Sequence, residues 1–69
     1  YQKSIAVFKF LTEEFPENAN IYDSLGEAYF ITEDYKNTLI SFKKALELNP
    51  DMKTSKNYIK KIKELSTQQ

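Results

Sequence analysis

The sequence repeats itself after 34 residues, and this period constrains the possible folds more than any other feature. Both copies, residues 1–17 and 35–51, carry apolar residues at the i, i+3, i+4, i+7 spacing of one helix face and end at a proline. The matched pairs are Tyr1 and Tyr35, Ile5 and Leu39, Phe8 and Phe42, Leu11 and Ala45, and Pro16 and Pro50. The period therefore predicts a helix over 1–15 and a second copy of it over 35–48.

Two further helices are predicted between and after these copies. Residues 19–32 and 54–66 carry apolar residues at helical spacing: Tyr22, Leu25 and Tyr29 in the first, and Tyr58, Ile59, Ile62 and Leu65 in the second. Asn18 and Asp34 are of the residue types that cap helix N-termini. No stretch alternates with the period of a strand, so the expected fold class is all-α with about four helices.

Composition narrows the function classes. The 69 residues include neither cysteine nor histidine, and ten lysines balance ten acidic residues. We therefore expect no cofactor and no metal, and catalysis has little support because no histidine could activate a serine. Asp23 and Glu27 form a carboxylate pair four residues apart, but such a pair is typical of a solvated helix face. No apolar run reaches the roughly 18 residues of a membrane span, and the sequence indicates no cellular compartment.

The residues between 22 and 50 resemble the tetratricopeptide repeat. Tyr22-x2-Leu25-Gly26-x2-Tyr29, followed by Thr38-x3-Phe42, Ala45 and Pro50, is similar to the signature of that 34-residue family. The departures are Tyr22 in place of tryptophan, Thr38 in place of alanine, and Glu33 in place of the usual turn glycine. The resemblance implies antiparallel helix-turn-helix repeats, that is, a fragment of an α-solenoid.

The resemblance also gives Gly26, the only glycine, a structural reason. A glycine inside a helix costs about 1 kcal/mol relative to alanine. In the family it lets the two helices of a hairpin lie close together, which predicts contact with helix 35–48 near Thr38 and Phe42. The expected organisation is the second helix of a truncated repeat (1–17), one full repeat (18–52), and a capping helix with a polar tail (53–69).

The two ends of this arrangement differ. A shift of 34 carries Tyr22, Gly26 and Tyr29 onto Lys56, Lys60 and Lys63, which predicts a capping helix with a polar outer face at the C-terminal end of an array. Helix 1–15 is instead rich in apolar side chains that further repeats, another domain or a second copy would have to cover. We expect self-association as a homodimer through this set: Ile5, Val7, Phe8, Phe10, Leu11 and Phe15.

In the family, the first helix of each hairpin lines a concave groove that binds peptides or proteins. Transferred by position, the groove residues are Asn20, Asp23, Glu27, Phe30, Ile31, Asn57 and Lys61. Phe30 and Ile31 are interpreted equally well as a contact patch or as packing at the hairpin turn. Because Asp23 and Glu27 would repel an acidic C-terminal peptide, we expect a basic or apolar ligand.

The predicted function is a non-catalytic protein-interaction or assembly module, a fragment of a larger protein that binds an unidentified protein or peptide. The alternative is a C-terminal repeat tail of a larger bacterial enzyme, because "IYDSLGEAYF", "ALELNP" and a lysine-rich helix are similar to tails of serine hydrolases and esterases. Contact with RNA or a membrane surface through the lysines of 53–63 is the least favoured interpretation, so neither partner is expected.

Overall fold

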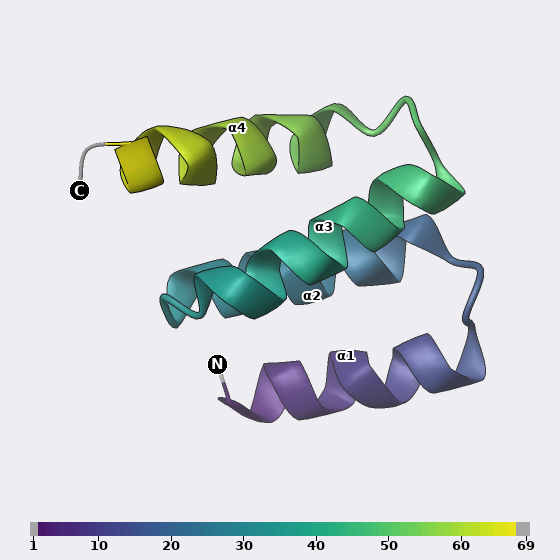
Figure 1. Cartoon of the computed structure of the whole chain (residues 1–69). Helices are drawn as coiled ribbons and strands as arrows, with labels where there is room; N and C mark the ends of the chain where they lie inside the picture. The colour runs from purple at the N-terminus through teal and green to yellow at the C-terminus, as the bar shows by residue number, and fades with distance from the viewer. Residues whose placement is uncertain (1, 68–69) are drawn as a thin grey trace.

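The computed structural model describes residues 2–67, and the side chains within 4–65. Four helices follow one another: α1 (Gln2–Glu14), α2 (Ala19–Ile31), α3 (Tyr35–Leu48) and α4 (Lys53–Thr67). Successive helices run back and forth, as Figure 1 shows. No strand occurs within the described residues. The prediction of an all-α helical-hairpin fold is confirmed, while Tyr1, Gln68 and Gln69 lie outside the described residues.

Local hydrogen bonds determine where α2 and α3 begin. The Asn18 side chain accepts from the backbone N–H of Asn20 at 3.0 Å and of Ile21 at 3.3 Å. The Asp34 carboxylate accepts from the N–H of Asn37 at 3.3 Å. Both oxygens thereby satisfy donors that have no partner inside the helix. The two predicted N-caps are confirmed.

The turn between α2 and α3 explains one departure from the family signature. Glu33 has a φ of 61°, in the left-handed region that usually selects glycine. Its N–H donates to the carbonyl oxygen of Phe30 at 3.0 Å. The N–H of Asp34 donates to the carbonyl oxygen of Tyr29, also at 3.0 Å. These bonds satisfy carbonyls at the end of α2 and hold a non-glycine residue in the conformation of the turn.

The α2–α3 hairpin is centred on Gly26 and Phe42. A Cβ added to Gly26 would lie 2.8 Å from Cε1 of Phe42, which shows how closely the two helices approach. Phe42 is fully buried, and its ring stacks on Tyr58 of α4 with centroids 4.8 Å apart. Thr38 is also fully buried, and its hydroxyl donates to the carbonyl of Asp34 at 2.8 Å. The expected close approach at Gly26 is confirmed.

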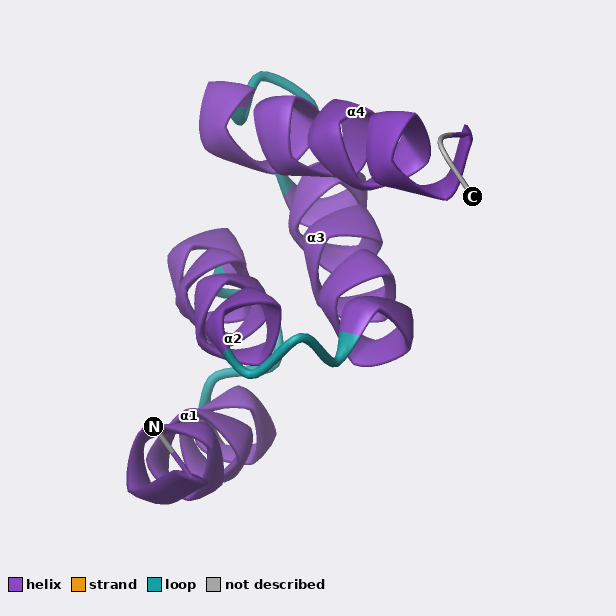
Figure 2. Cartoon of the chain, turned by 90° about the vertical axis from the view of Figure 1, so that its left-hand side faces the viewer, coloured by secondary structure: helices purple, strands orange, loops and turns teal. Residues whose placement is uncertain are grey.

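The helices form a flat stack measuring 37 × 27 × 13 Å, which Figure 2 shows with α4 and α1 at opposite ends. α1 packs on α2 through a cluster that contains Ile5, Leu25 and Ala28, with Phe8 and Tyr29 beside it. α4 packs on α3 and more lightly on α2. Each helix thus depends on its immediate neighbours, as in a repeat array.

Candidate functional site

A hydrogen bond joins the two helices that carry the predicted groove residues. The hydroxyl of Ser55, at the start of α4, donates to Oδ1 of Asp23 on α2 at 2.8 Å. Ser55 is fully buried and Asp23 is half-buried. Asp23 therefore orients α4 against α2 as well as contributing negative charge to this face.

Glu27 lies one helical turn beyond Asp23 and is also half-buried. Burial, and secondly the charge of Asp23, raises the pKa of the Glu27 carboxyl. Burial also raises the pKa of Tyr58 on α4, with smaller contributions from the charges of Glu27 and Asp23. Among the described residues, neither carboxylate has an ion-pair partner. An ion pair from Lys44 Nζ to Glu47 Oε1, at 3.8 Å, lies on α3.

Aromatic side chains border the acidic pair toward α3 and α4. The Phe30 ring lies edge-on to Tyr58 with centroids 5.0 Å apart, and 5.7 Å from the ring of Tyr35. Lys61 Nζ stands 5.4 Å from the centroid of the same Phe30 ring. Phe30 thus packs at the hairpin end between three helices, whereas its neighbour Ile31 is 52% exposed.

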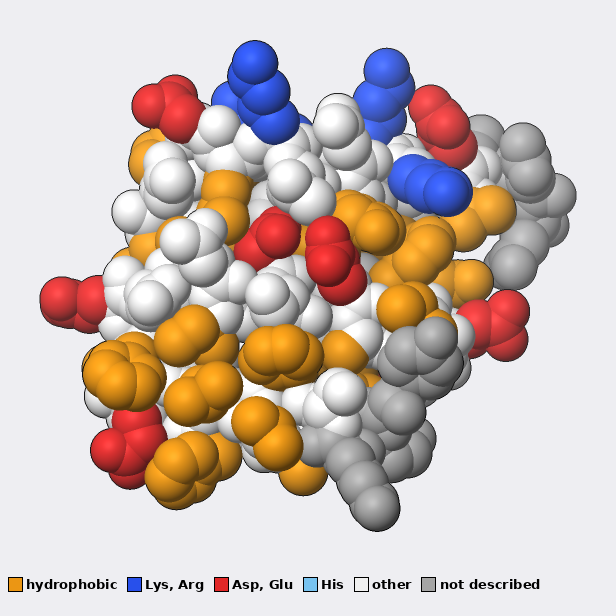
Figure 3. Space-filling model, turned by 180° about the vertical axis from the view of Figure 1, so that it is seen from behind, with side chains coloured by type: hydrophobic (Ala, Val, Ile, Leu, Met, Phe, Trp, Pro, Cys, Tyr) orange, Lys and Arg blue, Asp and Glu red, His pale blue; other side chains and the backbone are white. Residues whose placement is uncertain are grey.

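Ile31 belongs to a different part of the face. A shallow hollow of about 220 Å³ lies between α1 and α2, and Glu27 stands in its wall; the other lining residues are Ser4, Phe8, Ser24, Ala28 and Ile31. Figure 3, seen from behind, shows acidic side chains near the middle of this view, hydrophobic ones below and lysines along the α4 edge above. This face thus carries hydrophobic, acidic and basic side chains close to one another.

The predicted groove residues do not form a single cluster. Asp23 contacts α4 through Ser55, and Phe30 contacts α4 through Lys61. Asn57 lines a small hollow of about 200 Å³ with Tyr58 and Lys61, whereas Glu27 and Ile31 line the hollow between α1 and α2. Asn20 instead lines an open hollow at the opposite end of α2, between the α1–α2 loop and the end of α3. We define the groove surface as Asp23, Glu27, Phe30, Ile31, Asn57, Tyr58 and Lys61.

Ser55 and Tyr58 were not among the predicted site residues. The shift of 34 places them on Ile21 and Ser24, so the repeat assigns them neither a buried hydroxyl nor an aromatic contact. The role of Tyr58 was only weakly indicated by the sequence, since this residue is aromatic where the preceding repeat has Ser24.

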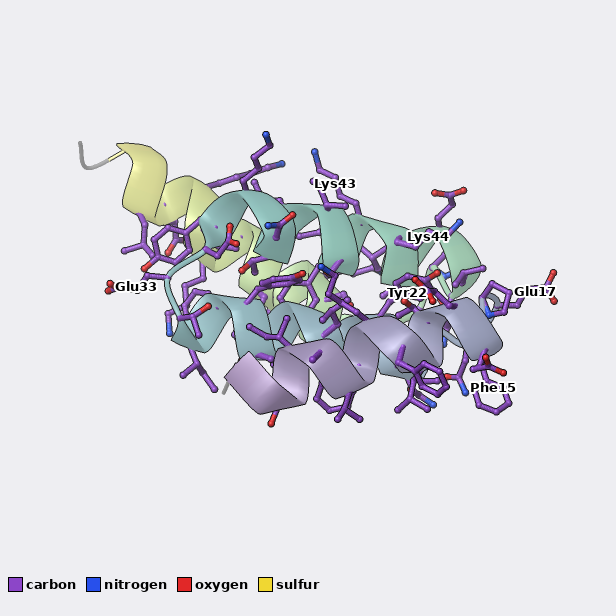
Figure 4. All side chains as sticks on the ribbon, turned by 90° about the horizontal axis from the view of Figure 1, so that it is seen from below. Phe15, Glu17, Tyr22, Glu33, Lys43 and Lys44 are labelled. Carbon is purple, nitrogen blue, oxygen red and sulfur yellow. The ribbon has the colours of Figure 1, made fainter. Side chains whose placement is uncertain are left out.

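The predicted self-association set divides into two groups. Ile5 is buried against α2, and Phe8 and Leu11 are half-buried. Val7, Phe10 and Phe15 are more than half exposed, at 56%, 58% and 56%. Figure 4 shows Phe15 projecting from the loop that follows α1.

The repeat explains why Val7 is exposed. Its counterpart on α3 is Ser41, which is only 4% exposed because α2 lies against it. No described helix occupies the corresponding place beside α1. The exposed side of α1 is thus the side by which α3 contacts its hairpin partner.

α4 has one apolar and one polar side. Ile62 is buried and Ile59 is half-buried, whereas Lys56, Lys60 and Lys63 are exposed. One side of α4 is therefore polar, and its role as the cap of an array stays a prediction. Of the described helices, none is long and apolar enough to cross a bilayer.

The hairpin of α2 and α3, its 34-residue period and the Gly26–Phe42 contact define a helical-hairpin repeat of the tetratricopeptide type. The chain is 37% identical to tetratricopeptide repeat protein 37 of Xenopus laevis over 65 residues, which is 94% of this chain and 4% of that protein. It is 53% identical to Superkiller complex protein 3 of Mus musculus over 36 residues, which is 52% of this chain and 2% of that protein.

The chain is accordingly a tetratricopeptide-repeat segment, and it spans only a small fraction of the length of these curated relatives. No family model matches it. No solved structure matches it either.

Proposed function

We propose that this segment is a non-catalytic protein-interaction module whose groove surface on α2 and α4 contacts a peptide or protein partner. The observation that carries the proposal is the pair of half-buried carboxylates, Asp23 and Glu27, which have no ion-pair partner among the described residues. Glu27 also stands in the wall of a hollow that Phe8, Ala28 and Ile31 line in part. Convergent polar and apolar groups on one concave face are typical of a ligand surface.

A selection experiment with the whole chain tests this proposal. Twelve-residue random peptides displayed on phage are selected on the immobilised protein, and the enriched peptides are titrated by fluorescence anisotropy. We expect Glu27→Lys, which reverses a charge inside the groove surface, to weaken binding at least threefold. Lys43→Glu, a reversal at an exposed position of α3, is the control and should leave binding unchanged. Failure to enrich any peptide, or equal effects of the two variants, would refute the proposal.

We also propose that the chain associates with a second copy through the exposed side of α1. Val7 and Phe10 form an apolar surface where α3 has a hairpin partner, and burying side chains of this kind contributes roughly 1.5 to 3 kcal/mol each. Two-fold pairing would bury the same surface twice, and two-fold dimers are the commonest closed assemblies.

Light scattering across micromolar concentrations tests the dimer. Phe10→Glu should shift the mass toward that of a monomer, because it puts a charge into the centre of the apolar surface. Ile40→Glu on α3 is a matched control, since Ile40 is 57% exposed and Phe10 is 58% exposed. A wild-type chain that stays monomeric, or identical behaviour of the two variants, would rule out this interface.

The alternative role is a repeat tail that packs on a serine hydrolase or joins its subunits. Only the resemblance of short sequence stretches supports it. The names of the two relatives describe a repeat protein and a protein of a complex. They favour the interaction module over the enzyme tail.

A further inference from the structure

Resting on the groove surface proposed above, we propose that its ligand is a peptide with a lysine or arginine side chain close to an apolar one. We further propose that Lys61 competes with the cationic side chain of that ligand for the groove.

The groove surface carries negative charge that no described side chain neutralises. Asp23 and Glu27 lie one turn apart on α2, are half-buried, and have no ion-pair partner among the described residues. The Ser55 hydroxyl bonds only one oxygen of Asp23 and is itself neutral. Burial, and secondly the charge of Asp23, raises the pKa of Glu27. A cationic side chain would relieve this repulsion, whereas an acidic one would add to it.

Apolar side chains lie next to the Glu27 carboxylate. Glu27 also stands in the wall of the hollow of about 220 Å³ between α1 and α2, together with Phe8, Ala28 and Ile31. Ile31 is 52% exposed, so an apolar ligand side chain would cover it. An extended peptide advances about 3.3 Å per residue. The cationic and apolar residues of the ligand should therefore be within about two or three positions of each other.

Lys61 supplies a positive charge at the edge of the groove surface. It occupies on α4 the position that Glu27 occupies on α2, and its Nζ lies over the Phe30 ring at 5.4 Å. The ammonium group is thus held at the edge of the groove surface, against an aromatic face that would also attract a ligand cation. Lys61 therefore places a positive charge on the groove surface that also carries Glu27, so it should weaken the binding of basic peptides.

The phage selection described above, carried out on the intact chain, tests this inference through the composition of the enriched peptides. We expect them to be net basic, with lysine or arginine two or three positions from leucine, isoleucine or phenylalanine. Binding of the best peptide should weaken as sodium chloride rises from 50 to 500 mM, because charge pairs at a surface are screened.

Three variants then isolate the charges. Glu27→Gln, which keeps the shape of the side chain, should weaken the basic peptide about threefold to tenfold. Lys61→Met, which keeps most of the length, should strengthen it about twofold to threefold. Glu33→Gln is the control, because it removes the same charge from an exposed turn residue. Circular dichroism checks that each variant is folded.

The possible outcomes separate this inference from the proposed function. Enriched peptides that are neutral or acidic, or a basic peptide that binds equally to Glu27→Gln and Glu33→Gln, would overturn the inference and leave the interaction module standing. Basic peptides that bind Lys61→Met no better than the wild type would overturn the competition by Lys61. Failure to enrich any peptide would overturn the proposed function and this inference with it.

Discussion

Replacing Gly26 by alanine tests the close approach of α2 and α3. The new Cβ would meet three ring atoms of Phe42 at 2.8, 2.9 and 2.9 Å. Phe42 has little room to move, because it is fully buried and its other face stacks on Tyr58 at an interplanar angle of 12°. The methyl group must therefore push α2 and α3 apart or force the ring from its place.

Two opposing terms determine the size of the effect. Alanine gains about 1 kcal/mol over glycine in a helix interior. Overpacking a filled core costs about 1 to 3 kcal/mol. We expect Gly26→Ala to lower the free energy of unfolding by about 1 kcal/mol, or to lower the melting temperature by about 4 to 8 °C. Urea and thermal denaturation, followed by circular dichroism at one fixed protein concentration, measure both quantities.

A double-mutant cycle shows whether the Phe42 ring is the cause. In a Phe42→Leu background the aromatic ring is absent, so the added methyl group should have room and Gly26→Ala should be neutral or stabilising by up to about 1 kcal/mol. If Gly26→Ala stabilised the wild type, or had the same effect in both backgrounds, the reasoning from close approach would be refuted.

Three further experiments test other parts of the structure. Ser55→Ala should lower the free energy of unfolding by about 1 kcal/mol, because it removes the side-chain hydrogen bond between α4 and α2, while Thr54→Ala at an exposed neighbour changes little in the same urea titration. Lys60→Ala should change stability by less than about 0.5 kcal/mol, whereas Gly26→Lys should unfold the chain; similar denaturation midpoints would contradict the polar outer face of α4. Glu27 holds its proton more tightly when folded, so its contribution to stability falls as pH rises from the ordinary glutamate pKa, 4.5, through its raised value. Glu27→Gln should therefore stabilise the chain at pH 7 more than at pH 4, and equal midpoint shifts at the two pH values would argue against burial of this carboxyl.

Local chemistry made most of the helix limits predictable. Asn18 and Asp34 bond N–H groups only two or three residues away, so their role depends on sequence alone. The first helix was predicted to reach residue 15 but ends at Glu14. The Phe15 N–H still donates to the carbonyl of Leu11 at 2.8 Å, but the proline after Phe15 disfavours the helical conformation there. The last helix extends one residue further at each end than predicted, from Lys53 to Thr67.

The groove surface was only partly predictable, because it depends on contacts between helices. Helical spacing placed Asp23 and Glu27 on one face, but it could not show that Ser55, 32 residues along the chain, would bond Asp23. It also left two interpretations of Phe30, and the contacts with Tyr35 and Tyr58 support packing at the hairpin end. Periodicity gives the direction of a side chain on its own helix, while its partner depends on how the helices cross.

Covering the exposed side of α1 should affect ligand binding in the hollow between α1 and α2. Val7 and Ser41 occupy the same position of the repeat, yet their exposed fractions are 56% and 4%, so the difference comes from the neighbouring helix. α1 packs on α2 alone among the described helices, so its order depends on that single contact. Phe8 of α1 is nevertheless one wall of the hollow that Glu27 borders. A second copy that covers Val7 and Phe10 would hold α1 in place and with it that wall. Dimer formation should therefore favour ligand binding in the hollow, and by linkage the ligand should favour the dimer to the same extent.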